Sequence, residues 1–495
     1  MTEIARKHLA ILGVSALAMV SAIAFAQSAP ALDPFASSNG IYPSQTDYSG
    51  PVHTANLDYP RPPAEVAAQR YQATLPINKG TAPAYLRGLI ASITPTLSGL
   101  VNDGARWDAR REGWYDMIWL GEGSRASDGS IDPESGREAV GNTYTGQILP
   151  PRAFCNRRMG KGTFGMALVA AAPPIPTKCD PNPGLPQGPI PTTSVQNHAV
   201  MYYNAIAAEM LGRVWRNPYA PAIDQIDFPA GSVVVKIEAV TSTEAEWPVV
   251  RNAATWQVYR PSVADALNPP AGGAKPQLLK VRPFQMSVAI KDRTASPTTG
   301  WVYAAFVYDA SAPGVTAWDR FVPVGAMWGN DPQLTSTPSG NNGSPDDLQQ
   351  TWFNSFAPLF THGARGWGGR LAGPMDVADR VNVLFTGGNN QSANLRQVGA
   401  SSCLSCHSAA EFPWTHNLYP APVRGFPRNG DPFMLYQPGS AEWARWFQNP
   451  SVPKGVSNAS VPRGLDYDFA LMFALGTQAT ATGQAGIGFR RFAVH

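Results

Sequence analysis

One stretch of the chain decides its fold class: FPAGSVVVKIEA, residues 228–239. Residues 228–231 have the composition of a turn, and the residues after them alternate between two kinds of side chain. Because successive side chains of a strand point to opposite sides, one side carries Val233, Val235 and Ile237. The other side carries Val234, Lys236 and Glu238. The stretch therefore predicts a β-strand with one apolar face and one mixed face.

Further strand-like runs follow this one along the chain, at 254–259, 284–290 and 301–308. Turns rich in Pro, Gly and Asn separate them. Short strands broken by turns favour an antiparallel arrangement, either a sheet or a sandwich. We therefore expect a β-rich domain at 226–335.

The regions on either side of this domain carry helical patterns. Residues 27–225 predict a loop-rich N-terminal region with helices at 85–101 and 198–215. Residues 344–495 predict a largely helical, loop-rich C-terminal region, with helices near 344–360, 441–447 and 466–475. The expected fold class is α+β, with a central antiparallel sheet or sandwich.

Composition limits the function classes. A chain of 495 residues can form two or three domains, and its 14 Trp argue against disorder because such side chains need burial. Its 47 Pro and 46 Gly indicate many turns. The formal net charge of +3 is too close to neutral to indicate a nucleic acid partner or an anionic membrane surface.

The motif Cys403-Leu404-Ser405-Cys406-His407 has the C-x-x-C-H spacing of a haem c attachment site. Two thiols on one turn can each form a thioether to a haem vinyl group, and the following His can ligate the iron as proximal axial ligand. We therefore expect one covalent haem c at Cys403 and Cys406, with His407 on the iron. A redox C-x-x-C pair or half of a zinc site are the alternatives, and no second ligand pair in the sequence completes a zinc site.

The presence or absence of a sixth, protein-derived iron ligand distinguishes an electron carrier from a reactive centre. Met472 is the first candidate, because it follows His407 by a separation common in small monohaem cytochromes, although a Met in an apolar helix is more often core packing. Met434 and His416 are weaker candidates, and an open site is an equal alternative. His198 is a distal ligand, a helix cap or a core histidine.

The N-terminus predicts export. Residues 1–26 combine a positive start, an apolar run and an Ala-x-Ala end, which together are typical of a cleaved signal peptide. No other stretch is long enough to span a bilayer, so we expect a periplasmic protein without a transmembrane anchor after cleavage. In that oxidising compartment Cys155 and Cys179 are expected to form a disulfide, the alternative being two thiols.

Four strings resemble an exported bacterial cytochrome c family with one haem motif and no assigned function: QMSVAIKD at 285–292, TGWVY at 299–303, VPVGAMWGNDP at 322–332 and SSCLSCH at 401–407. The resemblance implies monohaem chemistry. A weaker resemblance is to the hydroxylamine-oxidising cytochromes whose haem is cross-linked to a lysine, because FPAGSVVVK at 228–236 lies upstream of a late haem motif. It implies Lys236 as the cross-linking residue; the alternative is a solvated strand lysine.

The expected function is that of a periplasmic monohaem cytochrome c that exchanges electrons with an unknown redox partner protein. Its size is the argument against this, since a carrier needs only about a hundred residues. Two alternatives remain: a haem c oxidoreductase acting on a small molecule, and a haem protein that binds a gas.

Overall fold

The computed structural model describes the chain in segments. They are residues 48–51, 53, 55–60, 71–120, 143–154, 166–167, 188–333, 348–362, 370–376, 381–385, 394–398, 402–408, 410–413 and 463–482. All of them belong to one unit, Pro34–His495. The predicted signal peptide, Cys155, Cys179, His416, Met434 and the helix near 441–447 lie outside these residues.

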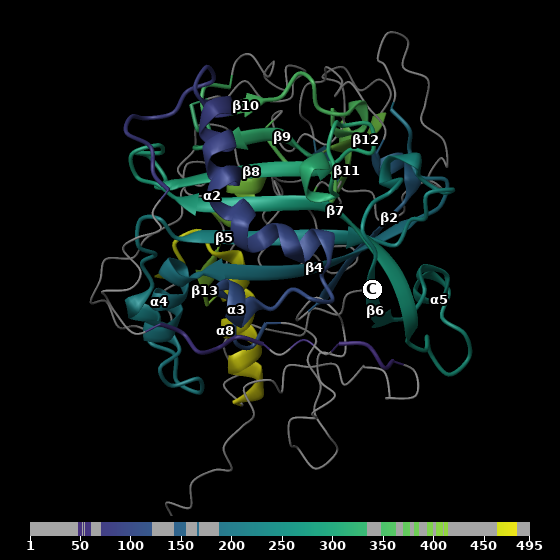
Figure 1. Cartoon of the computed structure of the whole chain (residues 1–495), viewed down its shortest axis with the longest axis horizontal. Coiled ribbons are helices and arrows are strands. Elements are labelled where there is room, and N and C mark those ends of the chain that lie inside the picture. The colour runs from purple at the N-terminus through teal and green to yellow at the C-terminus, as the bar shows by residue number, and fades with distance from the viewer. Residues whose placement is uncertain are drawn as a thin grey trace, which may run out of the picture. The chain divides into compact units, whose positions relative to one another are not determined.

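Within the described residues, nine antiparallel strands form one large sheet (Figure 1). The order along the sheet is β1 (Trp114–Tyr115), β4 (Val195–Asn204), β5 (Val233–Val240), β7 (Gln277–Lys291), β8 (Trp301–Tyr308), β9 (Phe321–Met327) and β10 (Thr351–Phe353). The other two, β2 (Tyr144–Leu149) and β6 (Trp256–Arg260), pair with β4 and β7. The sheet draws strands from all three regions that the sequence separates, because β1, β2 and β4 precede residue 226 and β10 follows residue 344.

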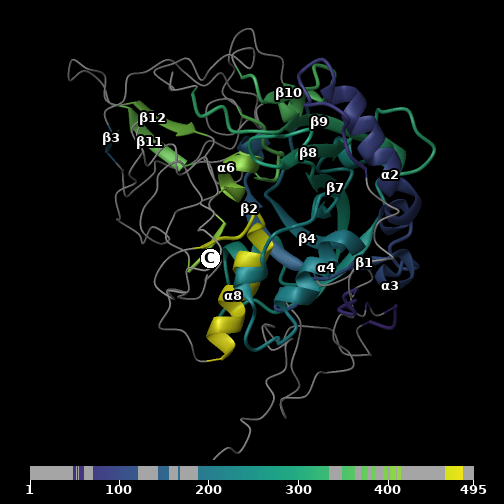
Figure 2. The ribbon, with the colours of Figure 1, turned by 90° about the vertical axis from the view of Figure 1, so that its left-hand side faces the viewer.

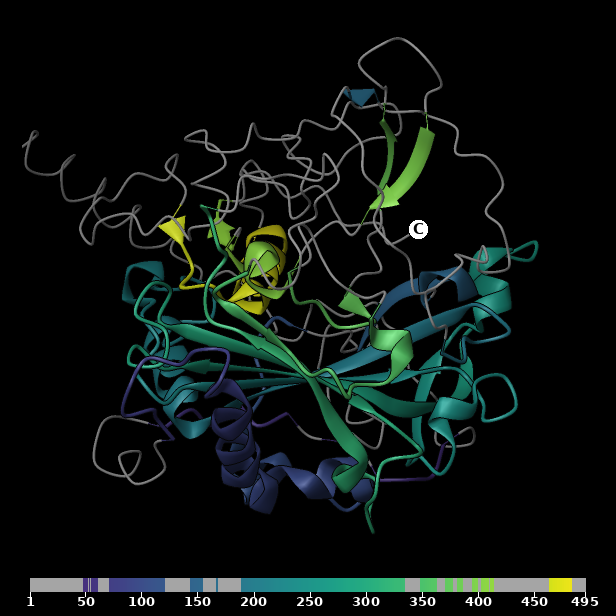
Figure 3. The same cartoon turned by 90° about the horizontal axis from the view of Figure 1, so that it is seen from above.

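Helices cover both faces of this sheet. On one side, α2 (Ala82–Asn102) packs in a cluster with Val235, Val288 and Ala304. On the other side, α4 (Ala205–Val214), α6 (Cys403–His407) and α8 (Phe469–Ala481) share a cluster with Tyr303 and Ala305. Figures 2 and 3 show purple α2 on one side of the strands and yellow α8 on the other. The fold is therefore α+β with a large antiparallel sheet, as predicted.

The remaining elements are short. Among the described residues, the other α-helices are α3 (Ala109–Glu112) and α5 (Val263–Leu267). The 3-10 helices in this part of the chain are η2 (Pro151–Phe154), η3 (Ile223–Gln225), η4 (Pro248–Val250), η5 (Trp318–Arg320) and η6 (Leu359–Thr361). Two small sheets pair β11 (Val381–Phe385) with both β12 (Asn394–Val398) and β3 (Met166–Ala167), and β13 (Glu411–Phe412) with β14 (Arg463–Gly464). No described helix has the length and apolar character needed to cross a membrane.

Two predicted helices differ from the structure: the first begins later than expected, and the second is not α-helical where the structure describes it. Residues 198–204 of the helix predicted at 198–215 belong to strand β4, and helix α4 begins only at Ala205. The strand is buried on both sides, so residues 199–203 form an unbroken apolar run that also fits a helical spacing. In the helix predicted at 344–360, residues 351–353 instead form β10, which pairs with β9, because Trp352 and Phe353 suit a half-buried strand. The strands predicted at 284–290 and 301–308, and the helices near 85–101 and 466–475, are confirmed.

Candidate functional site

Helix α6 places the two motif thiols on one turn against the sheet. Ser402 caps the helix by accepting a hydrogen bond from the Ser405 backbone N–H, and the Ser405 side chain accepts from the Ser402 N–H in return. The Cys403 N–H donates to the Leu371 carbonyl over 2.9 Å. Cys403 is buried and Cys406, three positions later, is half-buried on the same side of the turn. This spacing fits two thioether bonds to one haem.

His407 is held in the orientation that an iron ligand needs. Its Nδ1 lies 2.7 Å from the Tyr467 carbonyl oxygen. Because a carbonyl can only accept, Nδ1 is the donor and Nε2 keeps its lone pair for a metal. Burial lowers the pKa of His407 to about 4, against the opposing effect of the Tyr467 carbonyl. The imidazole is therefore neutral at neutral pH, which suits ligation of haem iron.

A strained turn presents the Tyr467 carbonyl to His407. Asp466 and Tyr467 both adopt positive φ, 50° and 65°, which non-glycine residues rarely do. The Asp466 carboxylate holds the turn, since it accepts from the Lys291 ammonium, the Trp301 indole at 3.1 Å and the Phe228 backbone N–H at 2.9 Å. The turn is thus fixed to the end of β7 and the start of β8.

Tyr303 completes the surroundings of the His407 ring. Its hydroxyl donates to the same Tyr467 carbonyl over 2.9 Å, and its ring centre lies 4.6 Å from that of His407. Phe469, at the start of α8, packs edge-on against the imidazole, with 6.1 Å between the two ring centres. Sheet and helix α8 together fix the imidazole plane.

Asp468 closes the turn as a buried acid. It accepts from the Tyr203 hydroxyl at 3.0 Å and from the Leu471 backbone N–H at 2.7 Å, in the manner of a helix cap for α8. Burial raises the pKa of Asp468 from 3.8 to about 6, although both hydrogen bonds oppose the shift. Because its pKa is raised in the folded state, folding binds a proton here, and stability falls as the pH rises from about 4 to 6.

We expect Asp468→Asn to remove this loss. Asparagine keeps the acceptor for Tyr203 and the cap for Leu471 but carries no charge. The difference in free energy of unfolding between the variant and the wild type should be about 2 kcal/mol larger at pH 7 than at pH 4, at 1.36 kcal/mol per pKa unit and with part of the loss already present at pH 4. Urea unfolding at the two pH values measures it, and an equal difference at both would contradict the assignment.

A cluster of charged and amide side chains lies on the same side of the sheet as α6. The Lys236 ammonium lies 2.7 Å from Asp376 and 3.2 Å from Glu238. The Gln285 amide bridges the two carboxylates, at 2.6 Å from Glu238 and 2.8 Å from Asp376. Asn197 donates to Glu238 over 2.7 Å. We call these five residues the carboxylate cluster.

The carboxylate cluster acts electrostatically on the haem motif. Burial, then the charge of Asp376, raises the pKa of the Cys403 thiol, and Lys236 opposes them. Lys236 also contributes to the low pKa of His407. The expectation of a solvated lysine is therefore wrong: the Lys236 side chain is only 20% exposed and is paired with two carboxylates. Burial lowers its pKa, but the two carboxylates outweigh burial and raise it well above the usual value, so Lys236 is protonated.

The two other ligand candidates that the structure describes, Met472 and His198, lie on opposite sides of the sheet. Met472 is buried in α8, one turn after Phe469, within the cluster that also holds Cys403. His198 is a buried strand residue, and its partner Ala239 belongs to the cluster on the α2 side of the sheet. Since α6 lies on the opposite side, this position does not suit a ligand to the same iron. Burial and Arg260 lower the pKa of His198 to about 3, as in a neutral core histidine.

Sequence reasoning missed the partners of the motif. The acceptor for His407 is a backbone oxygen, which has no side-chain signature. Asp376 follows Lys236 by 140 positions, in a loop segment without a periodic pattern. An Asp on each side of Tyr467 was the one local signal that a fixed turn stands there.

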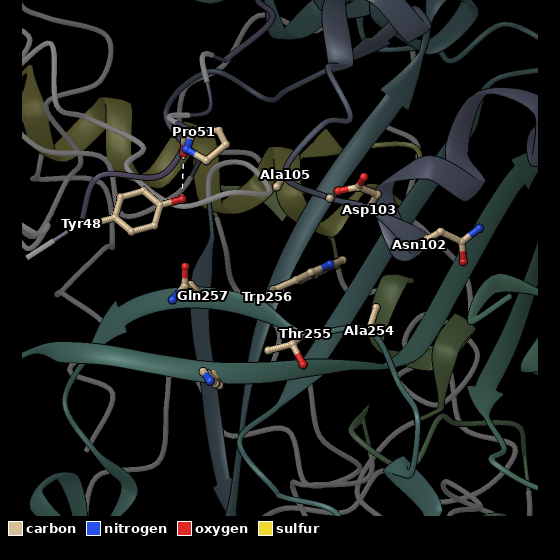
Figure 4. A pocket seen from close by; sticks show the side chains of 11 residues that line it. Tyr48, Pro51, Asn102, Asp103, Ala105, Ala254, Thr255, Trp256 and Gln257 are labelled. Carbon is tan, nitrogen blue, oxygen red and sulfur yellow. Dashed lines mark hydrogen bonds between the residues drawn. The ribbon is translucent and has the colours of Figure 1, made fainter.

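A pocket of about 280 Å³ lies away from the motif, beside the C-terminal end of α2 (Figure 4). Tyr48, Asn102, Asp103 and Gln257 are among the residues that line it, and Trp256 on its wall belongs to the α2 cluster. None of the lining residues belongs to the motif or the carboxylate cluster.

Comparisons with family models, with curated proteins and with solved structures found no match for this chain.

Proposed function

We propose that the chain is a monohaem c-type cytochrome of the periplasm, with haem attached to Cys403 and Cys406 and ligated through His407. One observation carries the proposal: the imidazole of a C-x-x-C-H motif donates Nδ1 to a backbone carbonyl held by a fixed turn, so that Nε2 is left as a ligand. The two remaining sequence-based expectations, the signal peptide at 1–26 and the disulfide between Cys155 and Cys179, belong to this proposal.

Each residue has a defined part in the proposed site. Haem iron would supply one-electron redox chemistry. Cys403 and Cys406 would hold the haem covalently and His407 would ligate its iron through Nε2, while the Tyr467 carbonyl accepts from Nδ1 and so makes the imidazole a stronger ligand. Residues 344–495 would then be the haem c region, and the function is exchange of electrons with a redox partner protein.

A second candidate function is that of a haem c oxidoreductase acting on a small molecule. The charges of Lys236, Glu238 and Asp376 on the same side of the sheet as α6 favour it, because buried ionisable groups with shifted pKa values cluster at active sites. The weaker resemblance adds a cross-link at Lys236. Against that cross-link stands the ion pair, which keeps the Lys236 amine protonated and thus without a lone pair for bond formation.

The visible spectrum of the exported protein separates these functions. We expect a low-spin reduced spectrum that carbon monoxide leaves unchanged, as two protein ligands produce in an electron carrier. A high-spin spectrum that shifts with carbon monoxide would indicate an open iron and favour the oxidoreductase or a gas-binding protein. Absence of any haem spectrum from protein matured with a haem c attachment system would overturn the proposal.

A matched variant tests the sixth ligand. Met472→Leu nearly conserves side-chain volume in the core of α8 but removes the thioether. If Met472 ligates the iron, the variant should become high-spin and respond to carbon monoxide. An unchanged spectrum would exclude Met472.

A further inference from the structure

The carboxylate cluster is built around one buried acid. Glu238 is 2% exposed, and three elements meet at its carboxylate. Strand β4 contributes Asn197, which donates to Oε1, and strand β7 contributes Gln285, which donates to Oε2. Lys236 on its own strand approaches Oε2 at 3.2 Å and also binds Asp376. Glu238 is thus held in one position by groups from separate parts of the chain.

The charges of the cluster do not balance. Two carboxylates, Glu238 and Asp376, share the single cation Lys236, so the ionised cluster carries one net negative charge. Burial raises the pKa of Glu238 to about 7, Lys236 lowers it and Asp376 raises it. Tyr144 of β2 also interacts with this group, but burial raises its pKa far above neutral and it stays protonated. Glu238 is therefore the member of the cluster that exchanges a proton near neutral pH.

The cluster connects the motif with solvent. Lys236 and Asp376 interact electrostatically with Cys403 and His407 on α6. Their side chains are 20% and 26% exposed, whereas that of Glu238 is 3% exposed. Glu238 contacts Lys236 directly and is bridged to Asp376 by Gln285, so the path from solvent to Glu238 runs through the same two charges that act on the motif.

We propose that Glu238 is a redox-linked proton-binding site, which takes up one proton from solvent when the haem iron gains one electron from an external donor. The inference rests on the proposed function. Iron(III) becomes iron(II), the Glu238 carboxylate becomes a carboxylic acid, and the net charge of the interior is unchanged. The physical reason is that an added electron next to a cluster of net charge −1 costs much less in a low-dielectric interior when a proton enters with it.

The test is the midpoint potential of the haem-loaded protein between pH 5 and pH 9. We expect the reduced protein to bind the proton at least tenfold more tightly than the oxidised protein, which is a fall of about 59 mV or more across this range. Glu238→Gln should abolish the pH dependence, whereas Glu244→Gln, at an exposed position six residues later, should keep it. A wild-type potential independent of pH, or a slope that persists in Glu238→Gln, would overturn the inference and assign any slope to another group.

Two further measurements keep the inference testable if Glu238→Gln does not fold. The reduced-minus-oxidised infrared spectrum of the wild type should show a new carboxylic acid carbonyl band, and its absence would overturn the inference. Asn197→Ala removes a hydrogen bond that favours the charged form of Glu238. The pH range over which the midpoint potential changes should therefore move to higher pH. A range that stays in place would also overturn it. Failure of the proposed function is distinct, because the protein would then carry no covalent haem to titrate.

Discussion

We expect Cys403→Ala/Cys406→Ala to abolish covalent attachment of haem, and each single variant to leave at most one thioether and a less stable holoprotein. The thiols stand three positions apart on one capped turn, so each reaches a different vinyl group, and no other cysteine stands near enough in the sequence to replace them. The measurement is haem staining of a denaturing gel together with the intact mass of the exported protein. Haem that resists denaturation in the double variant would contradict the attachment site.

The chain offers a matched control for this experiment. Cys155→Ala/Cys179→Ala also removes two thiols, but these lie outside the haem motif. We expect this variant to keep its covalent haem in full. If both double variants lost haem equally, the cause would be a general failure of folding or export. The loss of haem from Cys403→Ala/Cys406→Ala would then not identify these two cysteines as the attachment site.

Local alternation was sufficient to find the sheet. Val233, Val235 and Ile237 do share the side that faces α2, and Lys236 and Glu238 share the other. The sequence did not show that this second side is also covered. A charged residue on a covered face needs partners, and those partners come from β4, β7 and the segment 370–376, which no local pattern connects to β5.

Continuous burial explains the largest error in the fold. In strand β4 both faces are covered, so the alternation that identifies a half-buried strand is lost and the residues fit a helix equally well. One feature of the sequence does predict the boundary between β4 and α4. Asn204 accepts from the Ala207 backbone N–H and caps α4, and an Asn before Ala-Ile-Ala-Ala is a typical helix start.

The motif identified three site residues because their chemistry depends on spacing within one turn. The rest of the site depends on tertiary contacts. Tyr467 acts through its backbone, and its turn is held by Asp466 through Lys291 and Trp301, more than 160 positions earlier. Such contacts follow from the fold, so they become visible only once the sheet and α8 are placed.

Asp466 holds the turn at Tyr467 in place, so its removal should lower the free energy of unfolding more than most single substitutions. Asp466→Ala leaves the Lys291 ammonium, whose side chain is 3% exposed, without its carboxylate and leaves the Trp301 indole and the Phe228 N–H without an acceptor. Loss of one partner of a buried ion pair typically costs 3–5 kcal/mol, so we expect the free energy of unfolding to fall by about that amount. Urea unfolding of the haem-loaded protein measures it.

A surface ion pair two residues from Lys291 provides the comparison. Asp227 pairs with Arg293 at 3.0 Å, but both side chains are largely exposed, so Asp227→Ala should cost less than about 1 kcal/mol. The double variant Lys291→Met/Asp466→Ala should recover part of the loss, because it no longer buries an unpaired cation. Asp466→Ala should also disturb the haem spectrum, since the Tyr467 carbonyl would no longer be fixed against His407, whereas Asp227→Ala should not. Equal costs for the two aspartates, with an unchanged spectrum in both, would mean that the turn does not depend on Asp466 and that His407 is positioned by α6 alone.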